Sequence, residues 1–76
     1  MTLDNAVQKA TQLFSLIGTK FKKNKNDKIE VVSRITAFKK ADGEWDIAIF
    51  FVPKNKTGIN QPDCFLADFT IDYQAM

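Results

Sequence analysis

The pair Asp42-Gly43 lies between two stretches of alternating apolar and polar residues, and it constrains the fold more than any other feature of the chain. An Asp-Gly pair favours a tight hairpin turn, because the central residues of such a turn must accept positive φ angles. The alternation on either side, over residues 29–40 and 45–52, is typical of strands with a buried face. The sequence therefore predicts an antiparallel hairpin at the centre of the chain.

The N-terminal segment predicts a helix that ends near Gly18. Its apolar residues recur every three or four positions, which places them on one face of an amphipathic helix. Thr2 is the expected N-cap, Asp4 lies in the first turn, and Gly18 can take the left-handed conformation that ends a helix. The apolar face comprises Leu3, Val7, Ala10, Phe14, Ile17 and Phe21.

A second alternating stretch follows a polar connection over residues 54–62. Its residues 63–73 predict a third strand. We therefore expect an α+β fold for a single small domain, residues 1–76, in which one N-terminal helix packs on a three-stranded antiparallel β-meander in the order α-β-β-β. The expected core comprises Leu3, Val7, Phe14, Ile17, Val31, Ile35, Trp45, Ile47, Ile49, Phe51, Phe65, Phe69 and Ile71.

The opposite face of this expected sheet is also apolar and has no second helix to cover it. Exposed apolar patches of this kind usually mark an interface. A curled sheet whose patch is partly shielded by the lysine-rich segment is the alternative. Another protein, or a second copy of the chain in a homodimer, would bind this face. The expected interface residues are Phe38, Phe50, Val52 and Leu66.

A lysine-rich segment follows the predicted helix and has neither a helical nor a strand period, so we expect a loop there. The net charge is +6 over residues 1–40 and −4 over residues 41–76, an asymmetry that can steer a charged partner. Nucleic acid is not the expected partner, because Arg34 is the one arginine and the second half is acidic; single-strand binding is the third hypothesis. The predicted basic rim comprises Lys20, Lys22, Lys23, Lys25 and Lys28.

The chain has no histidine and one cysteine, Cys64, which excludes internal disulfides, thiolate metal clusters and histidine-assisted nucleophiles. The carboxylates of Asp42, Glu44 and Asp46 lie beside an exposed turn, whereas general acid or base catalysis requires a buried or charge-coupled carboxylate. We therefore expect no enzymatic activity, no metal and no cofactor. Because the sequence has no long apolar run and no signal-like start, we expect a cytoplasmic protein with no membrane partner.

Four features follow one another along the chain: Thr2-Leu3-Asp4-Asn5-Ala6, a helix ending near Phe21, Asp42-Gly43-Glu44-Trp45 and the stretch from Asp63 to Asp72. Their order resembles that of the gas vesicle protein O family, over nearly the whole chain but without that family's Gly-Tyr and Arg-Tyr-Arg ending. The resemblance implies an accessory role in gas vesicle assembly, through contacts with other vesicle proteins. The predicted function is thus that of a non-enzymatic protein-binding accessory domain; the alternative is a small phage- or plasmid-type inhibitor that masks a host protein.

Overall fold

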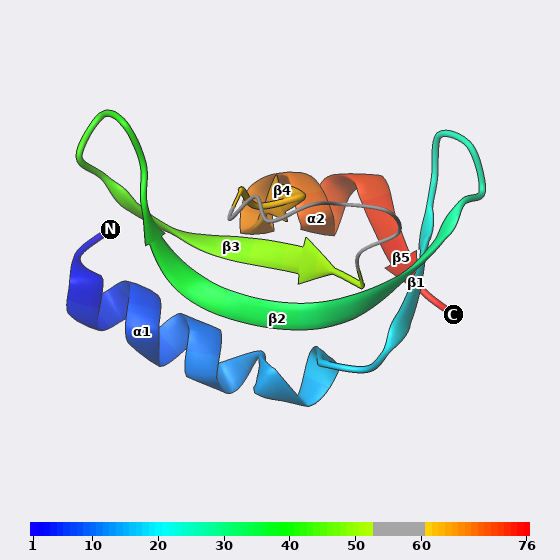
Figure 1. Cartoon of the computed structure of the whole chain (residues 1–76), viewed down its shortest axis with the longest axis horizontal. Coiled ribbons are helices and arrows are strands. Elements are labelled where there is room, and N and C mark those ends of the chain that lie inside the picture. The colour runs from blue at the N-terminus through cyan, green and yellow to red at the C-terminus, as the bar shows by residue number, and fades with distance from the viewer. Residues whose placement is uncertain (53–60) are drawn as a thin grey trace.

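The computed structural model describes residues 1–52 and 61–76 (Figure 1). The strands form one antiparallel sheet in the order β4-β3-β2-β1-β5. The α+β class, the N-terminal helix and the antiparallel sheet are confirmed. The three-stranded meander is wrong, because the described residues form five strands and a second helix. In chain order the elements are α1 (Leu3–Gln12), the short 3-10 helix η1 (Phe14–Leu16), β1 (Lys20–Lys23), β2 (Ile29–Lys39), β3 (Trp45–Phe51), β4 (Cys64–Phe65), α2 (Leu66–Asp72) and β5 (Tyr73–Ala75).

The predicted central hairpin between β2 and β3 forms, but the expectation of positive φ at both residues of the Asp-Gly pair is wrong, because Asp42 does not have one. Gly43 adopts a φ of +87°, which an L side chain rarely accepts. The backbone N–H of Lys40 donates to the carbonyl of Glu44 at 2.8 Å. The carboxylate of Asp42 accepts the backbone N–H of Glu44 at 2.9 Å. Both residues of the Asp-Gly pair therefore contribute directly to the turn.

A β-bulge interrupts β2 between Val32 and Arg34. Ser33 is the extra residue, and its hydroxyl donates to the carbonyl of Phe50 at 3.2 Å. The extra residue shifts the alternation of side chains by one position. Val32 and Ile35 consequently lie on the same side of the sheet, and both are buried.

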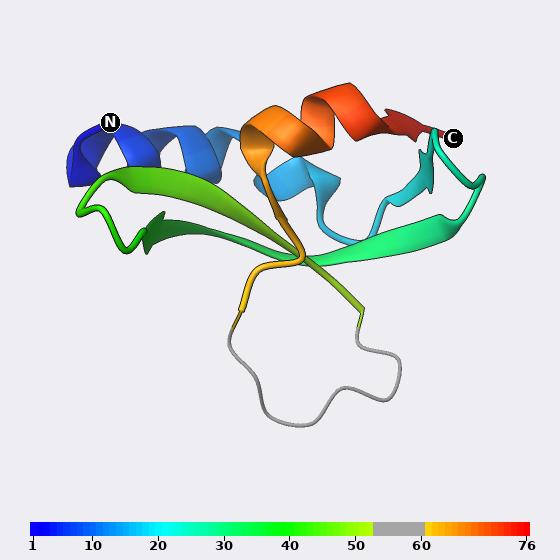
Figure 2. The same cartoon turned by 90° about the horizontal axis from the view of Figure 1, so that it is seen from above.

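Both helices lie on one face of the sheet, which we call the helix face (Figure 2). α1 packs against β2 and β3, whereas α2 packs against β3, β4 and β5. The opposite side of the sheet is called the far face. The buried core on the helix face comprises Ala6, Ala10, Phe21, Val32, Ile35, Ile47, Ile49, Phe51 and Phe69.

α1 begins at the predicted cap, since the hydroxyl of Thr2 accepts the backbone N–H of Asn5 at 3.2 Å. The helix contacts the sheet through Ala6 and Ala10, whose small side chains allow a close approach. The prediction that the large apolar residues of this helix form the core is wrong, because they lie on a flank rather than on the buried face. The exposed residues in question are Leu3, Val7, Phe14 and Ile17.

The lysine-rich segment, predicted as a loop, contains strand β1. This strand pairs with both β2 and β5. Phe21 is buried among its lysines and makes an edge-to-face contact with Phe69, with ring centroids 4.7 Å apart. The sequence shows no strand period here, because Phe21 is the segment's single apolar residue. It is held by its contact with Phe69, which is distant in the sequence.

The stretch predicted as a third strand over residues 63–73 instead forms β4, α2 and the start of β5. Its apolar residues also fit a helical spacing: Leu66, Phe69 and Tyr73 are three and four positions apart and pack in the core region. Ile71, predicted as a core residue, is 71% exposed. The residues of the predicted core that are partly buried instead are Val31, Trp45 and Phe65.

Candidate functional site

The predicted interface residues do not form one patch. Phe38 and Phe50 lie on the far face, on the side of their strands opposite the core. Val52 is exposed just after β3. Leu66 is the first residue of α2 and packs against the core, so its placement on the far face is wrong. The error follows from the helix that replaces the expected strand.

Cationic side chains cover the aromatic rings of the far face. The guanidinium of Arg34 lies 4.1 Å from the ring centroid of Phe50, which is 9% exposed. Phe38 contacts Phe65 edge to face, with centroids 5.8 Å apart, and the ammonium of Lys40 lies 5.7 Å from the Phe65 ring. These contacts shield apolar surface that the sequence predicted to be exposed. A homodimer through this face stays a prediction.

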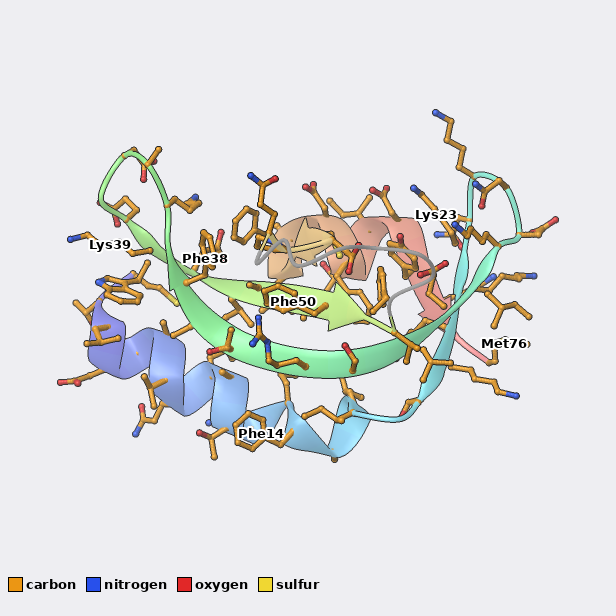
Figure 3. All side chains as sticks on the ribbon, viewed as in Figure 1. Phe14, Lys23, Phe38, Lys39, Phe50 and Met76 are labelled. Carbon is orange, nitrogen blue, oxygen red and sulfur yellow. The ribbon has the colours of Figure 1, made fainter. Side chains whose placement is uncertain are left out.

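The predicted basic rim lies on the β1–β2 hairpin and not beside Phe38. Figure 3 shows Lys23 and Phe38 at opposite ends of the sheet. Lys20 and Lys25 are exposed. The other three lysines have partners within the chain: the ammonium of Lys22 lies 3.7 Å from Asp27, that of Lys28 lies 3.4 Å from Glu30, and that of Lys23 lies 5.8 Å from the ring centroid of Tyr73.

A row of large apolar side chains lies exposed along α1 and η1, and we call it the α1 ridge: Leu3, Val7 and Phe14. These residues are 45%, 49% and 50% exposed. Their spacing of four and seven positions places them on one flank of the helix. In Figure 3, Phe14 lies on η1 at the margin of the molecule, away from β3 and α2. The α1 ridge is therefore an apolar surface that residues 1–52 and 61–76 do not cover.

A shallow groove follows the α1 ridge. Its walls are two rows of residues spaced by four, and such rows are the ridges between which a packing partner inserts its side chains. One row combines apolar side chains with the hydroxyl of Thr11, and the other is polar. The first row is Leu3, Val7 and Thr11, and the second is Asp4, Gln8 and Gln12.

The sequence interpretation assigned the α1 ridge to the core and so missed it as a surface. A signal for the true orientation was present. Ala6 and Ala10 are four positions apart, and Leu13 continues their row, which defines a second apolar face of small residues. Because this face fits closely against a sheet, the larger residues beside it remain on the flank.

The side chains considered for chemistry have structural partners. Asp46 accepts the backbone N–H of Ile47 at 2.7 Å, and its other oxygen lies 3.4 Å from the ammonium of Lys40. The carboxylate of Glu44 lies 3.2 Å from the N-terminal ammonium. Burial, together with nearby aspartates, raises the pKa of the Cys64 thiol to about 12. This thiol is therefore protonated at neutral pH and unsuited to nucleophilic attack.

No protein-family model, curated protein or solved structure matches the chain. Within residues 1–52 and 61–76, no helix combines the length and the apolar character needed to span a membrane. The same residues contain no group of three side chains suited to hold a metal ion.

Proposed function

We propose that this protein is a non-enzymatic protein-binding accessory domain and that the α1 ridge is its docking surface. The observation that supports this proposal is the orientation of α1. The helix contacts its own sheet through Ala6 and Ala10, and about half of each large ridge side chain is left in water. A chain optimised only for its own stability would be expected to bury the larger side chains.

The free energy available to a partner at this surface is substantial. Complete burial of one large apolar side chain stabilises by about 1.5–3 kcal/mol. The three ridge residues, each half-exposed, therefore offer roughly half of that value apiece to any protein that covers them. The groove beside the ridge gives such a partner a defined orientation.

The resemblance to the gas vesicle protein O family supplies one cellular setting for this proposal. In that setting the domain would bind another vesicle protein during assembly and would act by contact alone. We place the contact at the α1 ridge instead of at the far-face residues predicted from sequence, because Phe50 is buried under Arg34.

A pull-down from the native host tests the proposal, with mass spectrometry of the proteins that the tagged chain retains. The test variant is Val7→Asp, which places a charge in the α1 ridge. The matched control is Asn5→Asp, which adds the same charge at an exposed position on the opposite side of the helix. Circular dichroism of both variants verifies that α1 is folded.

We expect the wild type and Asn5→Asp to retain the same protein and Val7→Asp to lose it. Equal retention by all three chains would contradict the assignment of the α1 ridge. Vesicle proteins among the retained species would support the assembly role. A host enzyme would favour the inhibitor alternative, and retention of nucleic acid with a steep salt dependence would favour the third hypothesis.

A further inference from the structure

The second half of β2 has an edge that no strand occupies in the described part of the chain. β1 pairs with β2 through Ile29–Val31. Two further hydrogen bonds join the chain to Val32: its N–H donates to Thr19 at 3.1 Å, and its carbonyl accepts from Gly18 at 2.7 Å. From Ser33 onward, β2 has β3 on one side and no described strand on the other.

The hydrogen bonds of β3 show which backbone groups of β2 reach this edge. The carbonyl of Ile49 accepts the N–H of Asp63 at 3.0 Å, on the side of β3 that faces away from β2. Two residues directly opposite each other in an antiparallel pair point their backbone N–H and C=O groups either toward each other or away from each other. Because the groups of Ile49 point away from β2, those of the residue opposite it point away from β3. Ile35 is opposite Ile49, so its N–H and C=O point toward the unoccupied edge, and those of Ala37 and Lys39 do the same.

α1 lies behind this edge. Figure 1 shows α1 running along β2 on the side away from β3, and Figure 2 shows it on the helix face. A strand added at the edge would lie about 4.8 Å from β2, in front of α1. Alternate side chains of that strand would then face the α1 ridge. Leu3, Val7 and Phe14 thus occupy the place of core residues in a sheet that is one strand wider.

We propose that a protein partner adds an extended segment to the edge of β2 between Ser33 and Lys39, and that α1 covers this segment. The inference rests on the proposed function, because it uses the α1 ridge as the docking surface. The segment carries apolar residues at alternate positions, where they face the ridge. Acidic residues occupy positions between them, on the far face, because the exposed charged side chain of this part of β2 on that face is that of Arg34.

A second copy of the chain does not fit this site. In a two-fold pairing of two β2 edges, each copy would bring its own α1 behind the other copy's β2. The two helices would then be separated by about one strand spacing, 4.8 Å. Packed helices need an axial distance of about 8–10 Å. The geometry therefore favours a partner that contributes a single extended segment without a helix behind it.

The test uses a displayed library of nine-residue peptides with apolar residues at alternate positions, selected against the full chain. A control library groups the same residues so that they do not alternate. We expect binders from the first library alone, with acidic residues enriched between the apolar positions. Amide hydrogen exchange with the best peptide should show protection at Ile35, Ala37 and Lys39.

Three changes then examine the binding mode of the selected peptide. Val7→Asp alters the α1 ridge, and Ala37→Pro removes an N–H that faces the edge while leaving the ladder with β3 intact. Methylation of alternate backbone nitrogens in the peptide blocks strand pairing without altering the protein. We expect each change to weaken binding by at least about tenfold, the equivalent of one lost hydrogen bond or apolar contact.

The outcomes separate this inference from the proposed function. If Val7→Asp abolishes peptide binding but Ala37→Pro and methylation do not, the α1 ridge is a docking surface and strand addition is wrong. If no alternating peptide is selected, or if protection falls outside β2, strand addition is also wrong. If none of the three changes weakens binding, both proposals fail. Because methylation leaves the protein unchanged, the test remains decisive even where Ala37→Pro does not fold.

Discussion

The two sides of the central β2–β3 pair differ in how their outer edges are satisfied. On β3, the N–H of Phe51 donates to the carboxylate of Asp63 at 2.8 Å, the N–H of Ile47 donates to Asp46 at 2.7 Å, and β4 pairs with the strand between them. On β2, the N–H groups of Ile35 and Ala37 have no such acceptor among the described residues.

The helices behind these edges differ in the same sense. α2, on the β3 side, directs Phe69 into a cluster of aromatic rings that includes Phe21, Phe51 and Tyr73. α1, on the β2 side, leaves Phe14 exposed. Natural proteins usually block sheet edges, because an open edge templates pairing with other chains. Among the described residues, the outer edge on the β3 side is therefore satisfied, whereas the β2 side has an open edge and an exposed ring, on which the proposed site rests.

The two phenylalanines on the helix face give the largest contrast. Phe69→Ala should lower the free energy of unfolding by roughly 3–5 kcal/mol, because it removes a buried ring and leaves a cavity. Phe14→Ala should lower it by only about 1 kcal/mol, because half of that side chain is already in water and only the buried half is lost. Urea denaturation of both variants measures the difference. Similar losses would show that the ridge is part of the core.

The capping of β3 by Asp63 should have the next largest effect. Asp63→Ala removes the acceptor of the Phe51 N–H and should cost about 1–3 kcal/mol. Asp63→Asn retains an acceptor oxygen and should cost less. The control on the open edge is Lys39→Ala, whose exposed side chain should contribute almost nothing to stability. Equal losses from Asp63→Ala and Lys39→Ala in chemical denaturation would contradict the difference between the edges.

Alkaline pH should weaken the β3 side through Cys64. Burial raises the pKa of this thiol from 9.0 to about 12 in the folded chain. The folded chain therefore holds the proton more tightly, and stability falls as pH rises from 9 toward 12, because the unfolded chain loses its proton first. The expected loss is about 1 kcal/mol by pH 10.

Cys64→Ala should lack this part of the pH dependence. The comparison is best made at or below pH 10, because burial also raises the pKa of Tyr73 above its ordinary value of 10.0. Denaturation curves of the two chains at pH 7 and pH 10 measure the difference. Parallel losses in both would show that the thiol does not contribute.

Proline substitution in β2 should have the smallest effect if the edge is open. Ala37→Pro should lower the free energy of unfolding by less than about 1 kcal/mol, because the lost N–H bonds to nothing in the ladder. Thr36→Pro is the matched control, since the backbone N–H of Thr36 faces Ala48 of β3. Loss of this N–H should lower the free energy of unfolding several times more. Equal costs, measured by thermal denaturation, would show that the edge is already paired.

Local signals in the sequence predicted the parts of the fold that short-range physics determines. The hairpin with positive φ at Gly43 and the Thr2 cap depend on neighbouring residues and are confirmed. β1 and α2 depend on contacts between Phe21 and Phe69, which are distant in the sequence, and were not predicted. Alternation around Phe69 fits a strand as well as a helix, so periodicity alone could not separate them.

The sequence and the structure place exposed apolar side chains on different elements. An exposed apolar surface was expected, and the structure contains one, but on α1 and not on the far face. The helical period shows that the apolar residues of α1 share one face of the helix. It does not show which residues of that face contact the sheet. Ala6 and Ala10 decide this through shape, because small side chains permit close packing. The cation–π contact between Arg34 and Phe50 also depends on the pairing register of β2 and β3, which the periodicity of the sequence does not predict.

The β-bulge at Ser33 gives the proposed site a fixed length. Immediately before the bulge, the backbone N–H and C=O of Val32 are already bonded to Thr19 and Gly18, so the partner's extended segment must end there. Its ladder can extend over roughly 20 Å, the rise of the strand from Ser33 to Lys39. A longer extended segment must leave the sheet beyond Lys39, beside the turn at Asp42. The domain would thus select its partners by the length of their extended segment as well as by its pattern.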